Sequence, residues 1–263
     1  MLKPFLKLSD ISYFLFSKAL RGLEQTAAYN HEKRSMNNVI STENRNVMIL
    51  WFYNIVDQLD ASRVIVEFAT FYLDQYLFYL STETKQTMNI NLYRLSSLTA
   101  LYLALKVHCS TKVSPKVFAT LSNGAFRQSE LSTTETDILF ALKFRISPPS
   151  KKGMLDLYIG ALLSVQNHAN ATNIPNKSTW KRISNIASYL CELSIMEERL
   201  RFYSPSMIAF SSLLVSMEKL VQFEYIYLCK EYLAKIINFS KEDNLVEQCC
   251  EVLRAALTES MSA

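Results

Sequence analysis

Glycine and proline are scarce in this chain: its 263 residues include only four Gly and six Pro. Strand-rich folds and phosphate-binding loops need glycine where the backbone turns sharply or approaches a ligand, so both classes are disfavoured. The three His are far apart, and none forms a metal-ligand motif with Cys or carboxylates. GxGxxG, GxxxxGK[ST], HExxH and GxSxG motifs are also absent. We therefore expect no metal, no cofactor and no catalytic residues, although a Cys–His pair that meets only in the fold stays open.

Cysteine usage and the lengths of the apolar runs indicate the compartment. The Cys count is odd, no CxxC occurs, and most Cys lie in apolar stretches, which favours reduced core thiols over a disulfide scaffold. The N-terminus has no long apolar stretch, and polar residues interrupt every apolar run well short of a membrane span. The sequence predicts a protein of the nucleus or cytoplasm with no membrane partner.

Charge is nearly balanced, with 28 Lys and Arg against 24 Asp and Glu. The surplus falls in residues 1–147, which hold 16 basic and 12 acidic residues, while residues 148–263 hold 12 of each. This surplus is too small to indicate a nucleic-acid partner, and ordinary solvated helix faces account for it. The hydrophobic fraction of 49% excludes a disordered chain.

Hydrophobic periodicity predicts an all-α protein. The strongest break is SPPSKKG at 147–153, where proline, serine and glycine cluster, and it places a domain boundary. We therefore expect residues 1–40 to form an N-terminal helix and a connection, followed by domains at 41–147 and 148–263. Helices are predicted at about 5–30, 43–59, 62–80, 90–108, 114–122, 129–144, 151–166, 178–198, 205–220, 222–236 and 240–258.

Four short motifs follow one another between residues 45 and 146. RNVMILW (45–51) places an Arg six residues before a Trp, and YLDQYL (72–77) sets an Asp among apolar residues. SLTALYLALK (97–106) runs through small and apolar residues to a Lys, and ETDILFALKFRI (135–146) begins with Glu. Together these motifs resemble a cyclin box, the five-helix module of the regulatory subunits of cyclin-dependent kinases.

The second half is similar to a C-terminal cyclin fold, although less distinctively. YLCELSIMEE (189–198) and YSPSMIAFSSLLVSM (203–217) resemble the second and third helices of that domain. The resemblance thus covers about residues 40–258 and implies two tandem five-helix cyclin-like domains preceded by an N-terminal helix.

The resemblance also implies roles for particular residues. Arg45 and Asp74 would form a buried ion pair that ties the first helix of the box to the second; two unrelated surface charges are the alternative. Lys106 and Glu135 would face the kinase, where the ammonium meets backbone carbonyls at the end of the mobile C helix; a solvated Lys and a solvated Glu are the alternative. The apolar part of the kinase interface would comprise Leu103, Val107, Leu139, Phe144 and Ile146, unless these residues are core, and Phe144 is the best candidate for its anchor.

A second functional surface of the family is only partly matched by this sequence. Val47, Met48 and Trp51 match the apolar groove where some cyclins dock Arg-x-Leu peptides of substrates and inhibitors. The family's acidic residue is replaced here by Asn54, and its Gln is replaced by Arg94. Loss of the carboxylate and gain of a cation should weaken capture of a peptide Arg, so the groove serves another motif or Trp51 is core.

The resemblance implies a regulatory subunit, not itself an enzyme, that binds and allosterically activates a cyclin-dependent Ser/Thr protein kinase. Its partners would be that kinase and, at the groove, substrate or inhibitor peptides, with no nucleic acid. One alternative is a cyclin-fold transcription or adaptor protein that binds nucleic acid or a peptide instead of a kinase. An all-α enzyme is a more distant alternative.

Overall fold

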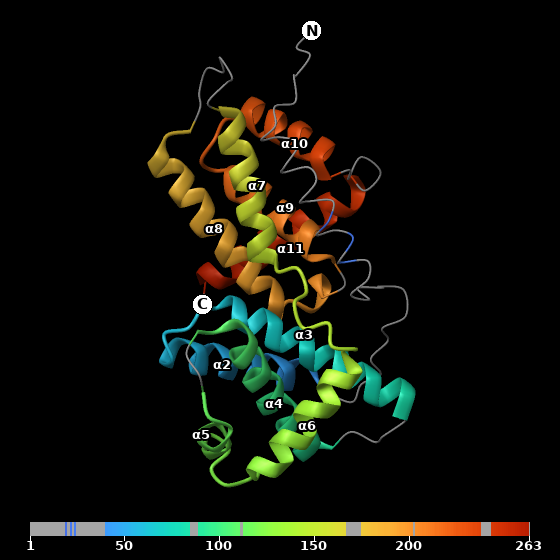
Figure 1. Cartoon of the computed structure of the whole chain (residues 1–263). Helices are drawn as coiled ribbons and strands as arrows, with labels where there is room; N and C mark the ends of the chain where they lie inside the picture. The colour runs from blue at the N-terminus through green and yellow to red at the C-terminus, as the bar shows by residue number, and fades with distance from the viewer. Residues whose placement is uncertain are drawn as a thin grey trace. The chain divides into compact units, whose positions relative to one another are not determined.

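The computed structural model describes two compact units of the chain. One unit is Glu32–Pro148, and the other combines Met1–His31 with Pro149–Ala263. The structure describes Ala19, Gly22, Glu24 and residues 40–84, 89–110, 113–166, 175–201, 203–237 and 243–262. The helix expected at 5–30 therefore lies outside the described residues, apart from three positions. All regular structure in the described ranges is helical, which confirms the all-α prediction (Figure 1).

The first unit is built around α4 (Ile90–His108), a helix whose central part is enclosed. Its residues 96–105 are all buried, and it packs against α3 and α6. The small side chains of serine and threonine let neighbouring helices approach α4 closely. Their buried hydroxyls donate hydrogen bonds to backbone carbonyls of the preceding turn, as Ser97 Oγ does to the carbonyl of Tyr93 at 2.7 Å. The elements of this unit are α2 (Thr42–Gln58), α3 (Val64–Tyr79), the π-helical turn η2 (Leu80–Thr84), α4 (Ile90–His108), α5 (Pro115–Thr120) and α6 (Gln128–Ala141).

The second unit repeats this construction around α9, in which every residue is buried. Ser204 begins the helix as the Ser-Pro signal predicts, since its side chain accepts a hydrogen bond from the Met207 N–H and Pro205 follows it. Helices α7, α8 and α11 pack around α9. The elements of this unit are α7 (Lys151–Gln166), α8 (Lys177–Met196), the 3₁₀ turn η3 (Glu198–Leu200), α9 (Pro205–Met217), α10 (Phe223–Ile237) and α11 (Asp243–Ser262).

A residue from the N-terminal segment completes the start of α9. The Glu24 side chain is buried, and its two oxygens accept hydrogen bonds from the backbone N–H and the hydroxyl of Ser206, each at 2.7 Å. The first turn of a helix leaves its N–H groups without partners and favours negative charge, so a carboxylate stabilises it. Glu24 therefore joins the second unit across 182 residues of sequence.

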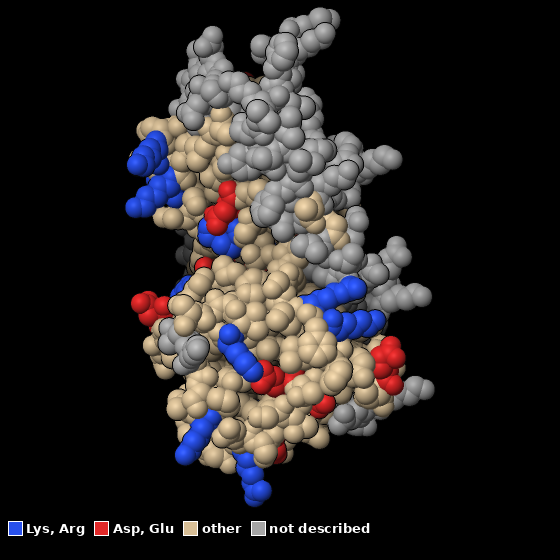
Figure 2. All heavy atoms as spheres, viewed as in Figure 1, with Lys and Arg blue, Asp and Glu red and all other residues tan. Residues whose placement is uncertain are grey.

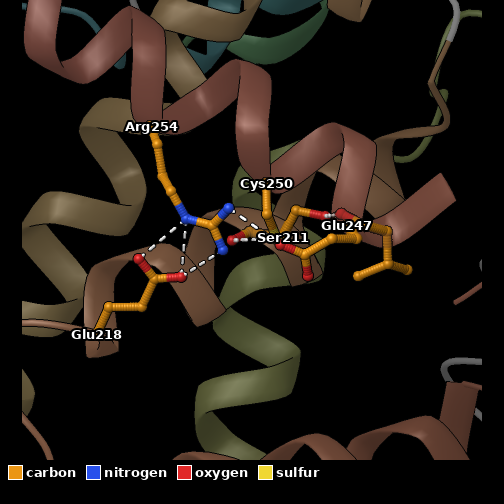
Figure 3. A network of polar contacts seen from close by, with 6 residues as sticks. Ser211, Glu218, Glu247, Cys250 and Arg254 are labelled. Atoms are coloured by element: carbon orange, nitrogen blue, oxygen red, sulfur yellow. Dashed lines mark hydrogen bonds and ion pairs between the residues drawn. The ribbon is translucent and has the colours of Figure 1, made fainter. Parts of the chain in front are cut away.

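Helix α11 carries both ion pairs and buried thiols. Arg254 of α11 points at Glu218, which follows α9, with Nη2 2.7 Å from Oε1, and its Nη1 lies 3.0 Å from Oε1 of Glu247 on the same helix (Figure 3). All three side chains are partly exposed, so these pairs contribute little to stability, and only the pair with Glu218 links α11 to the end of α9. Burial raises the pKa of Cys249 to about 11 and that of Cys250 to about 12.

No disulfide joins any of the five cysteines, all of which the structure describes, and four of them are buried. None of the helices in the described ranges is both long enough and apolar enough to cross a bilayer.

Candidate functional site

An exposed ion pair joins the last turn of α4 to α6. Lys106 Nζ lies 2.7 Å from Glu135 Oε1, and the two residues are 29 positions apart in the sequence. The Lys106 side chain is 53% exposed whereas that of Glu135 is 14% exposed, so the carboxylate sits below the ammonium. The hydrogen bond from Lys106 to Glu135 raises the pKa of Lys106, which keeps the amine charged at neutral pH. An ammonium has three donors, so two N–H groups remain for a partner's acceptors.

The segment after α6 is fixed to α3 and α4 by a polar cluster that the sequence did not indicate. The Tyr72 hydroxyl donates to the carbonyl of Ile146, and His108 Nε2 lies 2.9 Å from that hydroxyl and 3.0 Å from that carbonyl. The His108 ring stacks on Phe68, with centroids 3.8 Å apart. Burial lowers the pKa of His108, so its ring is neutral at pH 7. A carbonyl can only accept, which assigns the proton of the neutral ring to Nε2.

The turn that ends α6 presents Phe144 to solvent. The residue is 61% exposed, and its backbone N–H donates to the carbonyl of Leu139 at 2.9 Å. Lys143 and Phe144 both have positive φ, at 51° and 58°, in the left-handed region that non-glycine residues rarely adopt. The sequence predicted Phe144 as an anchor, and the structure leaves its side chain open to a partner.

The remaining predicted interface residues are not equally available. Val107, Leu139 and Ile146 are partly buried, so each keeps some surface for a partner. Leu103 is only 2% exposed because it lies on the enclosed part of α4. The structure therefore places Leu103 in the core, the alternative left open for these apolar residues.

Arg45 of α2 and Asp74 of α3 are brought together by the first two helices of the unit. Arg45 Nη2 lies 3.0 Å from Asp74 Oδ2, and the two side chains are only 9% and 15% exposed. An ion pair withdrawn from water in this way demands a defined geometry, so it sets the register between α2 and α3. Its role is structural, and it offers no surface to a ligand.

The residues of the expected docking groove lie on α2 and α4. Val47 is 65% exposed, while Met48 and Trp51 are partly buried, so Trp51 retains some open surface. Asn54 on α2 and Arg94 on α4 are both exposed. Leu50, which no sequence motif indicated, is 54% exposed and shares the outward side of α2 with Val47 at helical spacing.

Charged side chains are scattered over the face shown in Figure 2. Small groups of Lys and Arg, and of Asp and Glu, are separated there by uncharged residues. That distribution lacks the continuous basic stripe by which a protein follows a nucleic-acid backbone. In the described ranges, no group of three or more His, Cys, Asp or Glu side chains is placed to hold a metal ion.

Comparison with known families assigns both units. Residues 10–147 match the family described as "Cyclin, N-terminal domain", and residues 168–263 match "Cyclin, C-terminal domain". Among curated proteins, the chain is 23% identical over 177 residues to Cyclin-A1-2 of Arabidopsis thaliana, covering 67% of this chain and 36% of that protein. It is 22% identical over 208 residues to Cyclin-A3-1 of Oryza sativa subsp. japonica, covering 79% of this chain and 51% of that protein. The chain thus spans about half or less of these relatives.

Solved structures show the same fold. A viral cyclin from herpesvirus saimiri matches with a TM-score of 0.69 at 16% identity, covering 92% of this chain and 96% of that chain. A chain of the CAK complex from Chaetomium thermophilum bound to ATP-gamma-S matches with a TM-score of 0.57 at 14% identity, covering 94% and 74%. A chain of the yeast TFIIK (Kin28/Ccl1/Tfb3) complex also has a TM-score of 0.57, at 16% identity, covering 88% and 92%.

Proposed function

The chain belongs to the cyclin family, and we propose that it is a regulatory subunit that binds and allosterically activates a cyclin-dependent Ser/Thr protein kinase. The observation that carries this proposal is the Lys106–Glu135 pair, which lies on the same unit as the exposed Phe144. A few placed charges next to an apolar anchor are typical of a protein interface. The relatives named cyclin and the folds found in the CAK and TFIIK complexes support the same partner.

The charges of the pair suit the end of a kinase helix. The last carbonyls of a helix have no intrahelical partners and carry partial negative charge, so they accept hydrogen bonds from an ammonium. Lys106 offers two such N–H groups, and Glu135 holds the amine in place from below. Binding energy at this surface would keep the kinase C helix inward, where its glutamate pairs with the catalytic lysine.

The chain itself does no chemistry in this proposal. It changes the population of the active kinase by binding that conformation more tightly than the inactive one. The size of the activation therefore depends on the difference between two affinities, and tight binding alone would not activate the kinase.

A reconstitution experiment tests the proposal. The purified chain is mixed with each member of a panel of purified cyclin-dependent kinases, and phosphorylation of a peptide substrate is measured with and without it at physiological salt. We expect at least one kinase to gain activity and to co-elute with the chain in size-exclusion chromatography. Failure to bind any kinase, together with salt-resistant binding to a defined nucleic-acid site, would replace the proposal with the adaptor alternative.

The α2 surface gives a separate prediction about substrate docking. Because Asn54 and Arg94 supply no negative charge, we expect negligible binding of fluorescent Arg-x-Leu peptides in a polarisation titration. The double variant Asn54→Glu/Arg94→Gln should gain affinity, since it restores a carboxylate and removes a cation. Adding Trp51→Ala to that variant is the control and should abolish the gain. Tight binding by the wild type would show that the charge argument is wrong.

A further inference from the structure

Two exposed phenylalanine rings meet at the end of α6. Phe140 is 62% exposed and Phe144 is 61% exposed, and their ring centroids are 5.6 Å apart with an interplanar angle of 81°. This edge-to-face arrangement is favourable for aromatic rings, so the two side chains form one apolar surface and not two isolated residues. Phe140 was not among the residues that the sequence singled out.

The helix places Phe140 away from the core. The buried residues of α6 are Leu131, Thr134 and Ile138, which recur at helical spacing on one side. Phe140 follows Ile138 by two positions, which turns it about 200° around the helix axis. Phe140 therefore does not pack in the core of the unit. A polar side chain at this solvent-facing position would be better solvated than phenylalanine.

The backbone beside the pair is strained. Lys143 and Phe144 are consecutive non-glycine residues with positive φ. Each such residue costs about 1 kcal/mol or more, and such strain is concentrated at binding and catalytic sites. Here the strained turn brings the Phe144 ring back onto Phe140, so the fold maintains the exposed pair at a cost in stability.

The aromatic pair shares Phe144 with the proposed kinase surface, because the two rings are in contact. Phe140 lies five residues after Glu135 on α6, about 7.5 Å along the helix axis and about 140° around it, so Phe144 is the link between Phe140 and that surface. We propose that Phe140 contacts the kinase directly and that, with Phe144, it forms an aromatic edge that receives an aliphatic side chain of the kinase. This inference rests on the proposed kinase partner and adds a contact residue to it.

Affinity measurements with a kinase that binds the wild type test the inference. We expect Phe140→Ala to weaken binding at least tenfold, because exposed aromatic residues are the typical anchors of an interface. Phe223→Ala, at the start of α10, is the matched control: that ring is 77% exposed, and its loss should leave affinity unchanged. Thermal denaturation should show that both variants remain folded, since both side chains project into solvent.

A double-mutant cycle separates contact from positioning. If Phe140 only orients the neighbouring ring, Phe140→Ala will have no effect once Phe144 is already alanine. We expect a further loss of affinity in that background, since direct contact does not depend on the second ring. Wild-type affinity for the Phe140→Ala variant, or no effect in the Phe144→Ala background, would overturn the inference. If the wild type itself binds no kinase, it is the proposed function that fails.

Discussion

Alanine at Lys106 or at Glu135 is expected to weaken kinase binding by about 2 kcal/mol, which is more than tenfold in affinity, while the fold stays intact. Lys106→Ala removes the ammonium that would bond to the kinase. Glu135→Ala removes the carboxylate that lies 2.7 Å from the ammonium and fixes its position. Without it, the long Lys106 side chain loses more conformational entropy when the kinase binds. The two losses arise from one interaction.

The double variant distinguishes this mechanism from two independent contacts. Because Glu135 acts largely through Lys106, the effect of the double variant should be well below the sum of the single effects. The matched control is another pair of the same unit, Arg63 and Asp57, whose Nη2 and Oδ2 atoms are 2.8 Å apart and whose side chains are about half exposed. Alanine at those positions should leave kinase affinity unchanged.

Isothermal titration calorimetry against one purified kinase provides the measurement. Circular dichroism should show equal helix content and nearly equal melting temperatures for all variants, because exposed ion pairs contribute little to stability. Equal affinity for wild type and the Lys106→Ala/Glu135→Ala double variant would remove this surface from the mechanism.

Local signals explain why most helices could be predicted. The Ser-Pro dipeptide at 204–205 and the Asn89 cap, whose side chain accepts from the Leu92 N–H, lie at helix starts. Apolar residues at helical spacing then marked the lengths of the helices. Such signals need only a few consecutive residues, so a single sequence contains them.

Contacts between distant residues could not be predicted in the same way. The hydrogen bonds of Glu24 to Ser206, and those joining His108 and Tyr72 to Ile146, depend on how the helices pack, and neither leaves a local pattern. The core position of Leu103 could not be predicted for a related reason, since an apolar residue at helical spacing has the same sequence pattern whether it faces the core or a partner.

The phenylalanines at and just after the end of α6 carried a signal that could have been used. Phe140 and Phe144 are four residues apart at a helix end, a spacing at which side chains meet. Periodicity against Leu131, Thr134 and Ile138 would have assigned Phe140 to the solvent side of the helix. Two exposed aromatic residues in contact form a contiguous apolar patch, and such a patch indicates a binding surface more than a single exposed ring does.

Asp74→Asn is expected to destabilise the first unit by about 3 kcal/mol, because it removes the charge that compensates Arg45 in a nearly buried site. The guanidinium of Arg45 remains charged at all accessible pH values and cannot escape the cost by losing a proton. The carboxamide is almost the same size as the carboxylate, so packing is preserved and the change reports on the lost charge and the lost acceptor oxygen. Urea denaturation followed by circular dichroism should show a lower midpoint for the first unit.

A charge-free replacement tests the cause of that loss. In Arg45→Met/Asp74→Leu both ions are removed, and buried ion pairs replaced by apolar residues of similar volume are often neutral or stabilising. We therefore expect the double variant to be more stable than Asp74→Asn and close to the wild type. Arg63→Ala, which breaks an exposed pair, should cost no more than about 1 kcal/mol. If Asp74→Asn is no more costly than Arg63→Ala, the Arg45–Asp74 pair does not hold α2 against α3, and apolar packing between those helices must set their register.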